Sequence, residues 1–155
     1  MSDCCGPDKE KCEISKSCPR CKERGQQVAR ETVGAMAKLT VPAALLSHES
    51  FRYCATQTCP VVYYADSEAV LETRDVRVRV NAKDSGLDVP LCYCFSHTRG
   101  SIADELAATG KSTASASVAR EIKAGRCACE VKNPSGRCCL GEVRAYEKLA
   151  AEPGR

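Results

Sequence analysis

Thirteen cysteines in 155 residues, and the way they are grouped, limit the folds that this chain can adopt. Aromatic residues make up only 5% of the sequence and Trp is absent, so little large apolar surface is available for a core. A domain of fewer than about 80 residues rarely folds on an apolar core alone. We therefore expect two small domains, each held together by a bound metal.

The same cysteines would indicate disulfide bonds in a secreted chain. The residues after Met1 are polar, however, and do not form the apolar run of a signal peptide. No apolar run approaches the ~20 residues of a membrane span. We expect a cytoplasmic protein without membrane insertion, whose thiols bind metal. Because the number of cysteines is odd, at least one thiol lies outside any pairing.

The formal charge of +3 is a poor guide to the partners of this chain. Four thiolates around Zn²⁺, or around an oxidised two-iron core, carry a net charge of about −2, so a chain with both centres would be near −1. Arg74, Arg77 and Arg79 are interleaved with valines over residues 76–80, which favours a half-exposed strand rather than a basic stripe. Nucleic acid is therefore not an expected partner.

Two cysteine pairs in the first half have the spacing of a zinc site. Cys18 and Cys21 form a C-x2-C pair, which can reverse the chain around a metal, and Cys54 and Cys59 lie between strand-like residues. The combined spacing, C-x2-C-x32-C-x4-C, resembles zinc-ribbon patterns with a long spacer. A C-x2-C redox motif would open a helix after a strand, which is not the pattern here. His48 could replace one thiolate, although four cysteines already complete a tetrahedron.

Other patterns place the elements of this half. Val28, Thr32 and Val33 favour a strand, residues 41–46 a helical turn, and residues 60–64 a β-branched and aromatic strand. Gly86 and Pro90 mark a break. We therefore expect a flexible cysteine-containing tail over residues 1–17, a zinc-binding β domain over 18–82, and a helical domain over 90–152.

Six cysteines lie at the two ends of a predicted helical hairpin in the second half: Cys92, Cys94, Cys127, Cys129, Cys138 and Cys139. An iron–sulfur cluster needs four thiolates aimed at one small volume, usually from turns. The pattern therefore predicts a cluster; a second zinc site or an unliganded thiol group are the alternatives. His97 is expected in a loop or beside the ligands, because a Rieske centre would need two histidines.

The helices of this half have recognisable ends. Thr98 or Ser101 is expected to cap the first helix and Gly110 to end it, while a second helix starts near Ser112 or Thr113 and stops at Gly125. A third is predicted over residues 139–151. Its N-terminus would favour a thiolate and an anionic cluster, because unpaired N–H groups and the positive dipole end lie there.

Several of these segments together resemble a known family. The second half resembles bacterioferritin-associated ferredoxin-like 2Fe–2S domains, in which a helical hairpin separates C-x-C from two further cysteines. The whole chain resembles the N-terminal domain of CopZ-type copper chaperones, which joins a mononuclear zinc site to a 2Fe–2S site. The matching segments are Cys18-Pro19-Arg20-Cys21, the residues from Cys54 to Tyr64, Cys92-Tyr93-Cys94, and Asn133-Pro134-Ser135-Gly136-Arg137-Cys138-Cys139.

The resemblance implies an α+β fold in which a small zinc-ribbon-like β domain precedes a short-helix 2Fe–2S domain. The resemblance implies a zinc site whose ligands are Cys18, Cys21, Cys54 and Cys59. It implies a cluster whose ligands are Cys92, Cys94, Cys129 and Cys139. Cys139 is favoured over Cys138 as the last cluster ligand, and Cys127 is a further substitute.

Three further thiols, Cys4, Cys5 and Cys12, lie in the polar N-terminal segment and are soft ligands suited to Cu(I). Copper chaperones of this type carry a further domain with a Met-x-Cys-x-x-Cys loop, a pattern absent from the printed sequence. The tail thiols could replace it, or another chain could handle the copper.

No catalytic constellation is visible, so we expect a binding protein rather than an enzyme. It would be a metallochaperone or metal-resistance accessory protein for a thiophilic ion such as Cu(I). Its partners would be metal ions and a copper- or other metal-transporting ATPase or a separate copper chaperone domain. The alternative is a 2Fe–2S electron carrier that reduces a metal ion or serves a reductase.

Overall fold

The computed structural model describes residues 16–48, 50–65 and 69–152, which form two compact units divided between Val78 and Arg79. Most of the predicted tail, with its three thiols, lies outside these ranges. The division falls ahead of the predicted break near Gly86. The Tyr93 hydroxyl explains this, because it donates to the carbonyl of Arg79 and accepts from the N–H of Asn81 at 3.0 Å. Residues 79–81 are thereby tied to the second unit.

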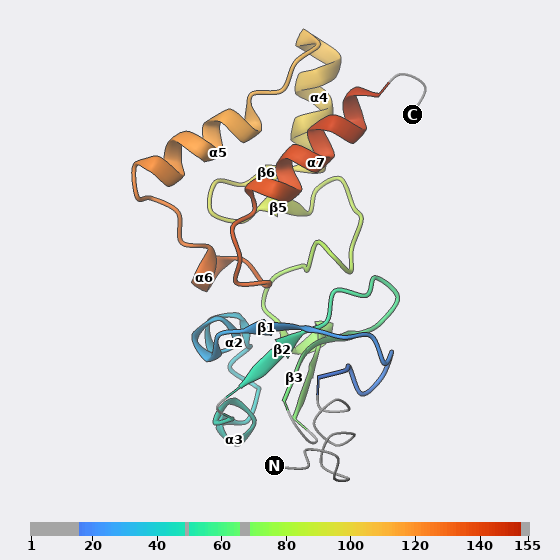
Figure 1. The fold of residues 1–155 in the computed structure, drawn as a ribbon, viewed down its shortest axis with the longest axis vertical. Coiled ribbons are helices and arrows are strands. Elements are labelled where there is room, and N and C mark those ends of the chain that lie inside the picture. Colours follow the sequence, from blue (N-terminus) through green and yellow to red (C-terminus); the bar gives the residue numbers. More distant parts are fainter. Residues whose placement is uncertain (1–15, 49, 66–68, 153–155) are drawn as a thin grey trace, which may run out of the picture. The chain divides into compact units, whose positions relative to one another are not determined.

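The first unit is built on a four-stranded antiparallel sheet in the order β1-β2-β3-β4 (Figure 1). β3 is buried along its whole length, as expected for a β-branched and aromatic run, and Tyr53 of β2 is paired with Tyr63 of β3. The predicted strand over residues 60–64 is thus confirmed. The strands are β1 (Gln26–Val28), β2 (Phe51–Tyr53), β3 (Val61–Tyr64) and β4 (Val70–Glu72).

Helices α2 (Arg30–Met36) and α3 (Ala43–Leu46) connect β1 to β2, and a 3-10 turn, η1 (Thr73–Asp75), follows β4. The helical turn predicted within residues 41–46 is found at Ala43–Leu46. The predicted strand is correct at Val28 and wrong at Thr32 and Val33, which lie on α2. Thr32, Val33 and Met36 are all buried, and a spacing of three and four residues places them on one face of a helix.

The predicted strand over residues 76–80 is also wrong. Val76 and Val80 are buried while Arg77 and Arg79 are exposed, so the alternation exists. The segment has no partner strand, however, and only Val76 forms an isolated bridge, to Ala37. The N–H of Arg77 instead donates to the carbonyl of Met36 at 2.9 Å. Alternation reports which side chains are buried, but a strand also needs a neighbouring backbone.

The second unit is a short β-hairpin surrounded by helices (Figure 1). Its core contains Leu91, Ile102, Val118 and Val143, which come from the hairpin and from α4, α5 and α7. The elements are β5 (Pro90–Cys92), β6 (His97–Thr98), α4 (Arg99–Thr109), α5 (Ala114–Lys123), α6 (Cys129–Lys132) and α7 (Leu140–Ala151).

The predicted ends of α4 are confirmed. Thr98 and Ser101 cap its start reciprocally, and Gly110 ends it in the left-handed conformation with φ 76°. α5 follows Thr113, and α7 follows Cys139, as predicted. Together the two units make the mixed helix and sheet fold that the sequence indicated.

Tyr64, at the end of β3, fastens the first cysteine turn to the sheet. Its hydroxyl accepts from the N–H of Gly25 at 2.8 Å and donates to the carbonyl of Lys16 at 2.7 Å. Gly25 is required here, because an added Cβ would lie 2.3 Å from the Tyr64 hydroxyl oxygen. The two bonds join residues on both sides of the turn that carries Cys18 and Cys21.

Replacing Tyr64 by Phe should lower the free energy of unfolding by about 1–3 kcal/mol, because two backbone groups lose their partner while the ring stays in place. Urea unfolding followed by circular dichroism measures the change. The control is Tyr146→Phe, a half-exposed tyrosine of the second unit, which should change stability by about 0.5 kcal/mol or less. Equal effects of the two variants would contradict this role of Tyr64.

Candidate metal centres

Cys18 and Cys21 lie on a tight turn at the start of the first unit. Ser17 forms a bridge with Arg24, and the N–H of Cys18 donates to the carbonyl of Glu23 at 2.8 Å. The chain reverses at Lys22, whose φ of 66° is left-handed. The N–H of Lys22 closes the turn on the carbonyl of Cys18 at 2.9 Å. This loop turns both thiols toward the sheet.

Cys54 and Cys59 lie on the connection between β2 and β3. The N–H of Cys54 donates to the carbonyl of Val62 at 2.9 Å, so this cysteine extends the pairing of the two strands. The N–H of Cys59 donates to the carbonyl of Thr56 at 3.2 Å, which bends the connection back toward Cys54. The second pair is thus fixed by the sheet itself.

The structure brings these four thiols together. The Sγ atoms of Cys18 and Cys59 are 3.8 Å apart, those of Cys21 and Cys54 are 3.6 Å apart, and all four lie within 4.8 Å of one another. Four thiolates bonded to Zn²⁺ at about 2.3 Å form a tetrahedron whose edges are about 3.8 Å. The donor set therefore fits a mononuclear zinc ion.

The surroundings of the four thiols differ. Cys18, Cys54 and Cys59 are buried, whereas Cys21 is half-buried. Burial raises the pKa of Cys18 to about 12 and also raises the pKa of Cys59. Burial raises the pKa of Cys21 too, but the Thr56 hydroxyl, 3.3 Å from its Sγ, and backbone N–H groups bring that pKa down to about 7. Without a cation, packing this many thiols together favours their protonated forms.

His48, the alternative ligand, lies elsewhere. Its ring is packed edge-on against Phe51, with the ring centroids 6.1 Å apart. Within the described ranges, the group of metal-ligating side chains around Cys18 contains cysteines only.

Cys92 and Cys94 lie on the β5–β6 hairpin of the second unit. Cys92 ends β5 opposite His97, and Cys94 lies in the turn, where Ser96 adopts a left-handed φ of 58°. Cys92 is fully buried and its sulfur accepts backbone N–H groups of the turn, including that of His97. His97, a residue of β6, therefore contacts the Cys92 sulfur through its backbone N–H.

The closing thiols are positioned by a folded turn around Asn133, which is 1% exposed. The Asn133 side-chain oxygen accepts from the N–H of Ser135 at 3.1 Å and from its hydroxyl at 3.0 Å. The Asn133 amide donates to the carbonyl of Arg137 at 2.9 Å. The turn delivers Cys139 to the first position before α7, buried, and leaves Cys138 exposed.

Four of the six thiols in this unit make two pairs. The Sγ atoms of Cys94 and Cys129 are 3.6 Å apart. Cys92 and Cys139 share a hydrogen bond between their side chains, and Cys139 also contacts Cys129. A two-iron cluster takes two thiolates on each iron, so paired thiols from a hairpin turn and a distant segment fit this donor set.

The thiols of this group differ in pKa because their hydrogen bonds and their burial differ. The hydrogen bond from Cys139 lowers the pKa of Cys92 to about 6, and the same bond, with burial, raises the pKa of Cys139. Burial, with the neighbouring Cys127 and Cys94 thiols, raises the pKa of Cys129 to about 12. The Cys92 thiol is thus more acidic than the Cys139 thiol.

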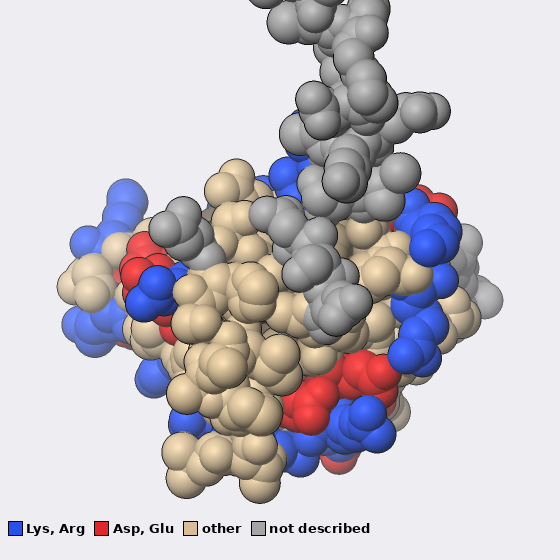
Figure 2. Space-filling model, turned by 90° about the horizontal axis from the view of Figure 1, so that it is seen from below, with Lys and Arg blue, Asp and Glu red and all other residues tan. Residues whose placement is uncertain are grey.

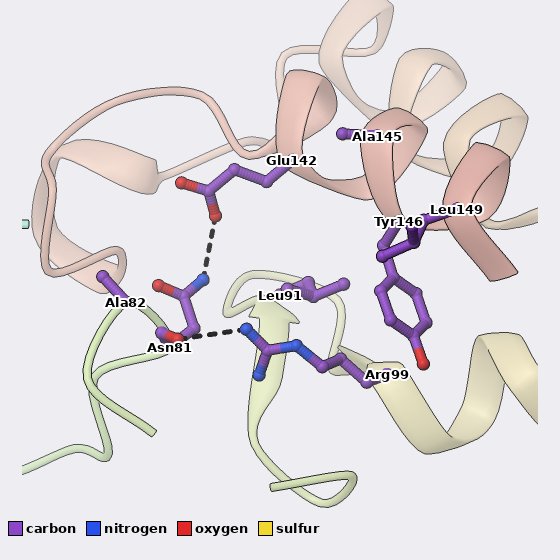
Figure 3. A pocket seen from close by; sticks show the side chains of 8 residues that line it. All are labelled: Asn81, Ala82, Leu91, Arg99, Glu142, Ala145, Tyr146 and Leu149. Atoms are coloured by element: carbon purple, nitrogen blue, oxygen red, sulfur yellow. Dashed lines mark hydrogen bonds between the residues drawn. The ribbon is translucent and has the colours of Figure 1, made fainter. Parts of the chain in front are cut away.

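A small pocket of the second unit is lined by Leu91, the residue before Cys92, and by residues of α4 and α7 (Figure 3). Its volume is about 340 Å³. Asn81 bridges its two sides: its side-chain amide donates to Glu142 of α7 at 2.9 Å, and its carbonyl accepts from Arg99 of α4 at 3.0 Å. The bridge holds the first turn of α7, and hence Cys139, against α4.

Several supporting residues were not found from the sequence. Thr56, Tyr64 and Asn133 each contact a ligand or hold its turn, through hydrogen bonds that composition and spacing do not reveal. Asn133 could have been found, because an Asn-Pro-Ser-Gly run is typical of a turn closed by an Asn side chain.

Charge and hydropathy add two observations. On the face shown in Figure 2, Lys and Arg side chains lie at the margins beside Asp and Glu, around an uncharged middle. Over the part of the chain that the structure describes, no helix has the length and apolar character needed to cross a membrane.

Comparisons with known proteins agree with this arrangement. A family model described as a zinc binding domain, zf_CopZ, matches residues 15–77. The chain is 32% identical over 142 residues to the copper chaperone CopZ of Archaeoglobus fulgidus, which covers 87% of this chain and 66% of that relative. The chain thus spans slightly less than two thirds of the relative's length.

A solved structure is similar over nearly its whole length. The X-ray structure of the Archaeoglobus fulgidus CopZ N-terminal domain matches with a TM-score of 0.65 and 31% identity, covering 83% of this chain and 95% of that chain. The likeness extends beyond the zinc binding segment into the helical unit. This chain therefore belongs to the family of the CopZ N-terminal domain.

Proposed function

We propose that this chain is a metallochaperone or metal-resistance accessory protein that handles a thiophilic ion such as Cu(I). Its resident centres would be Zn²⁺ on Cys18, Cys21, Cys54 and Cys59, and a 2Fe–2S cluster on Cys92, Cys94, Cys129 and Cys139. The observation that carries the proposal is the convergence of four thiols in the first unit and of paired thiols in the second, in a chain similar to a copper chaperone.

The zinc ion would serve the fold. Three of its four ligands are buried and they join the first turn to the β2–β3 connection, as a cross-link between distant segments would. Tetrahedral zinc sites with four cysteine ligands are closed to substrates. The thiols that handle cargo must then lie elsewhere.

The cluster would have one side near the surface, because Cys94 is half-buried while Cys92 and Cys139 are buried. This favours a second candidate function, in which the cluster passes one electron to a metal ion, such as Cu(II), or to a partner reductase. The two functions are compatible, since Cu(I) is the form that thiolates bind.

Cys4, Cys5 and Cys12 would receive or deliver Cu(I). They are surplus to both four-thiol groups, and thiolates exchange soft ions through low-coordinate intermediates. The partner would be a metal-transporting ATPase or a separate copper chaperone domain. A reducing cytoplasm is the proposed location, because the ten cysteines within the described ranges form no disulfide bonds.

Replacing Cys18 by Ser should remove zinc and unfold the first unit, because structural zinc supplies about 10 kcal/mol or more of folding free energy in small domains. Metal analysis and X-ray absorption measure the loss, and His48→Ala is the control that should keep zinc. A purified chain without zinc in a four-sulfur shell would contradict the assignment.

Replacing Cys139 by Ser should abolish or strongly alter the visible absorption of the anaerobically purified protein and lower its iron content from two atoms per chain. The matched control is Cys138→Ser, since that neighbouring thiol is exposed and should leave the spectrum unchanged. A colourless, iron-free wild-type chain after anaerobic reconstitution would refute the cluster.

Deleting residues 2–12 should remove about one equivalent of Cu(I) binding without changing zinc or iron content. Competition with a Cu(I) chelator measures this, at free Cu(I) too low to change the cluster absorption. Unchanged Cu(I) binding in the deletion variant would leave the electron carrier as the better function.

A further inference from the structure

One corner of the second thiol group contains a sulfur that a four-ligand cluster does not need. The Sγ atom of Cys127 is 3.3 Å from that of Cys129, which is 3.6 Å from that of Cys94. The three sulfur atoms all lie within 4.8 Å of one another. Three thiolates bonded at about 2.3 Å to one ion form a triangle with edges of roughly 4 Å. The three thiols therefore already surround a position for a single ion.

Two thiols of this corner are accessible to solvent, while the third, Cys129, is buried. Cys94 and Cys127 are half-buried, whereas Cys92 and Cys139 are 0% and 1% exposed. An ion arriving from solution would meet Cys94 and Cys127 before the inner pair. The exposed Cys138 is not among the three clustered thiols.

The backbone holds the corner in place. Cys127 and Cys129 flank Ala128, whose N–H donates to the Cys94 sulfur at 3.3 Å. Cys129 begins α6, so the loop carrying two of the thiols is fixed to the third. Three convergent thiolates without a hard oxygen ligand suit a soft monovalent ion, which accepts a low coordination number.

We propose that Cys94, Cys127 and Cys129 form a three-thiolate site for Cu(I) that shares two ligands with the cluster, so that the two cannot be filled together. The inference rests on the proposed function and gives its cargo a second location, in the folded part of the chain. Binding would be a ligand exchange without electron transfer: Cys127 would release its proton to solvent, and Cys94 and Cys129 would bind copper as thiolates in place of the cluster. The inner thiolates, Cys92 and Cys139, would take up protons from solvent as iron and sulfide are released.

The test is an anaerobic titration of the cluster-loaded full chain with Cu(I) at concentrations set by a competing chelator, followed by visible absorption. Buffering keeps the tail thiols from depleting free Cu(I). The Cys127→Ser variant should lose half its cluster absorption only at a free Cu(I) concentration about ten-fold or more above that needed by the wild type. Loss of a residue that merely supports a metal ligand lowers metal affinity by about ten-fold, and loss of a ligand should cost at least as much. Cys138→Ser, which removes a different surplus thiol, should match the wild type.

Equal bleaching of the wild type and Cys127→Ser would overturn the proposal, as would an equal shift in Cys138→Ser. A cluster that persists in all three proteins when a further equivalent of Cu(I) is bound would also overturn it. If the wild type never binds iron, the proposed cluster is refuted, and the three-thiol Cu(I) site is then tested by itself. The iron-free full chain should then bind Cu(I) more tightly than Cys127→Ser by the same factor, and equal affinities would refute the site.

Discussion

Convergence of thiols from distant segments is the constraint on which each unit depends. In the first unit, Cys18, Cys54 and Cys59 pack with Val61 and Tyr64, so the sulfur atoms are part of the core. In the second, Cys92, Cys129 and Cys139 pack with Leu91, Ile102 and Val143. Burial raises the pKa of Cys18, Cys59 and Cys129. The hydrogen bond with Cys92, together with burial, raises the pKa of Cys139. A bound cation compensates the charge of the thiolates and joins segments that few apolar side chains could hold.

Hydrogen bonds outside the thiol groups hold the segments that carry the cysteines. Tyr64 and the bridge between Ser17 and Arg24 hold the first turn against the sheet. Asn133 closes its own turn with its side chain, and Asn81 holds the first turn of α7 through Glu142. Each of these contacts acts on the backbone beside a cysteine, so the protein itself fixes the positions of the thiols. Such preorganisation reduces the entropy lost on binding.

The sequence was most informative where a local signal decides the structure. Thr98 and Gly110 predicted the ends of α4, because capping and a left-handed residue are local requirements. The strand at residues 76–80 was wrong because alternation carries no information about a partner strand, and Thr32 and Val33 lie on a helix despite their β-branched side chains. Cysteine spacing indicated which thiols could meet, but it could not reveal Thr56, Ala128 or Asn81, whose roles arise only from tertiary contacts.

The number of residues in the turn before α7 determines which of two adjacent thiols faces inward. Cys138 and Cys139 are adjacent, yet one is exposed and the other buried, because Asn133 fixes the path of the backbone between them. One residue inserted after the turn would bring Cys138 toward the position of Cys139 in the register of the helix. Substitution within this loop should therefore be tolerated more readily than insertion or deletion. Loop length here acts as a selector between two otherwise equivalent sulfur atoms.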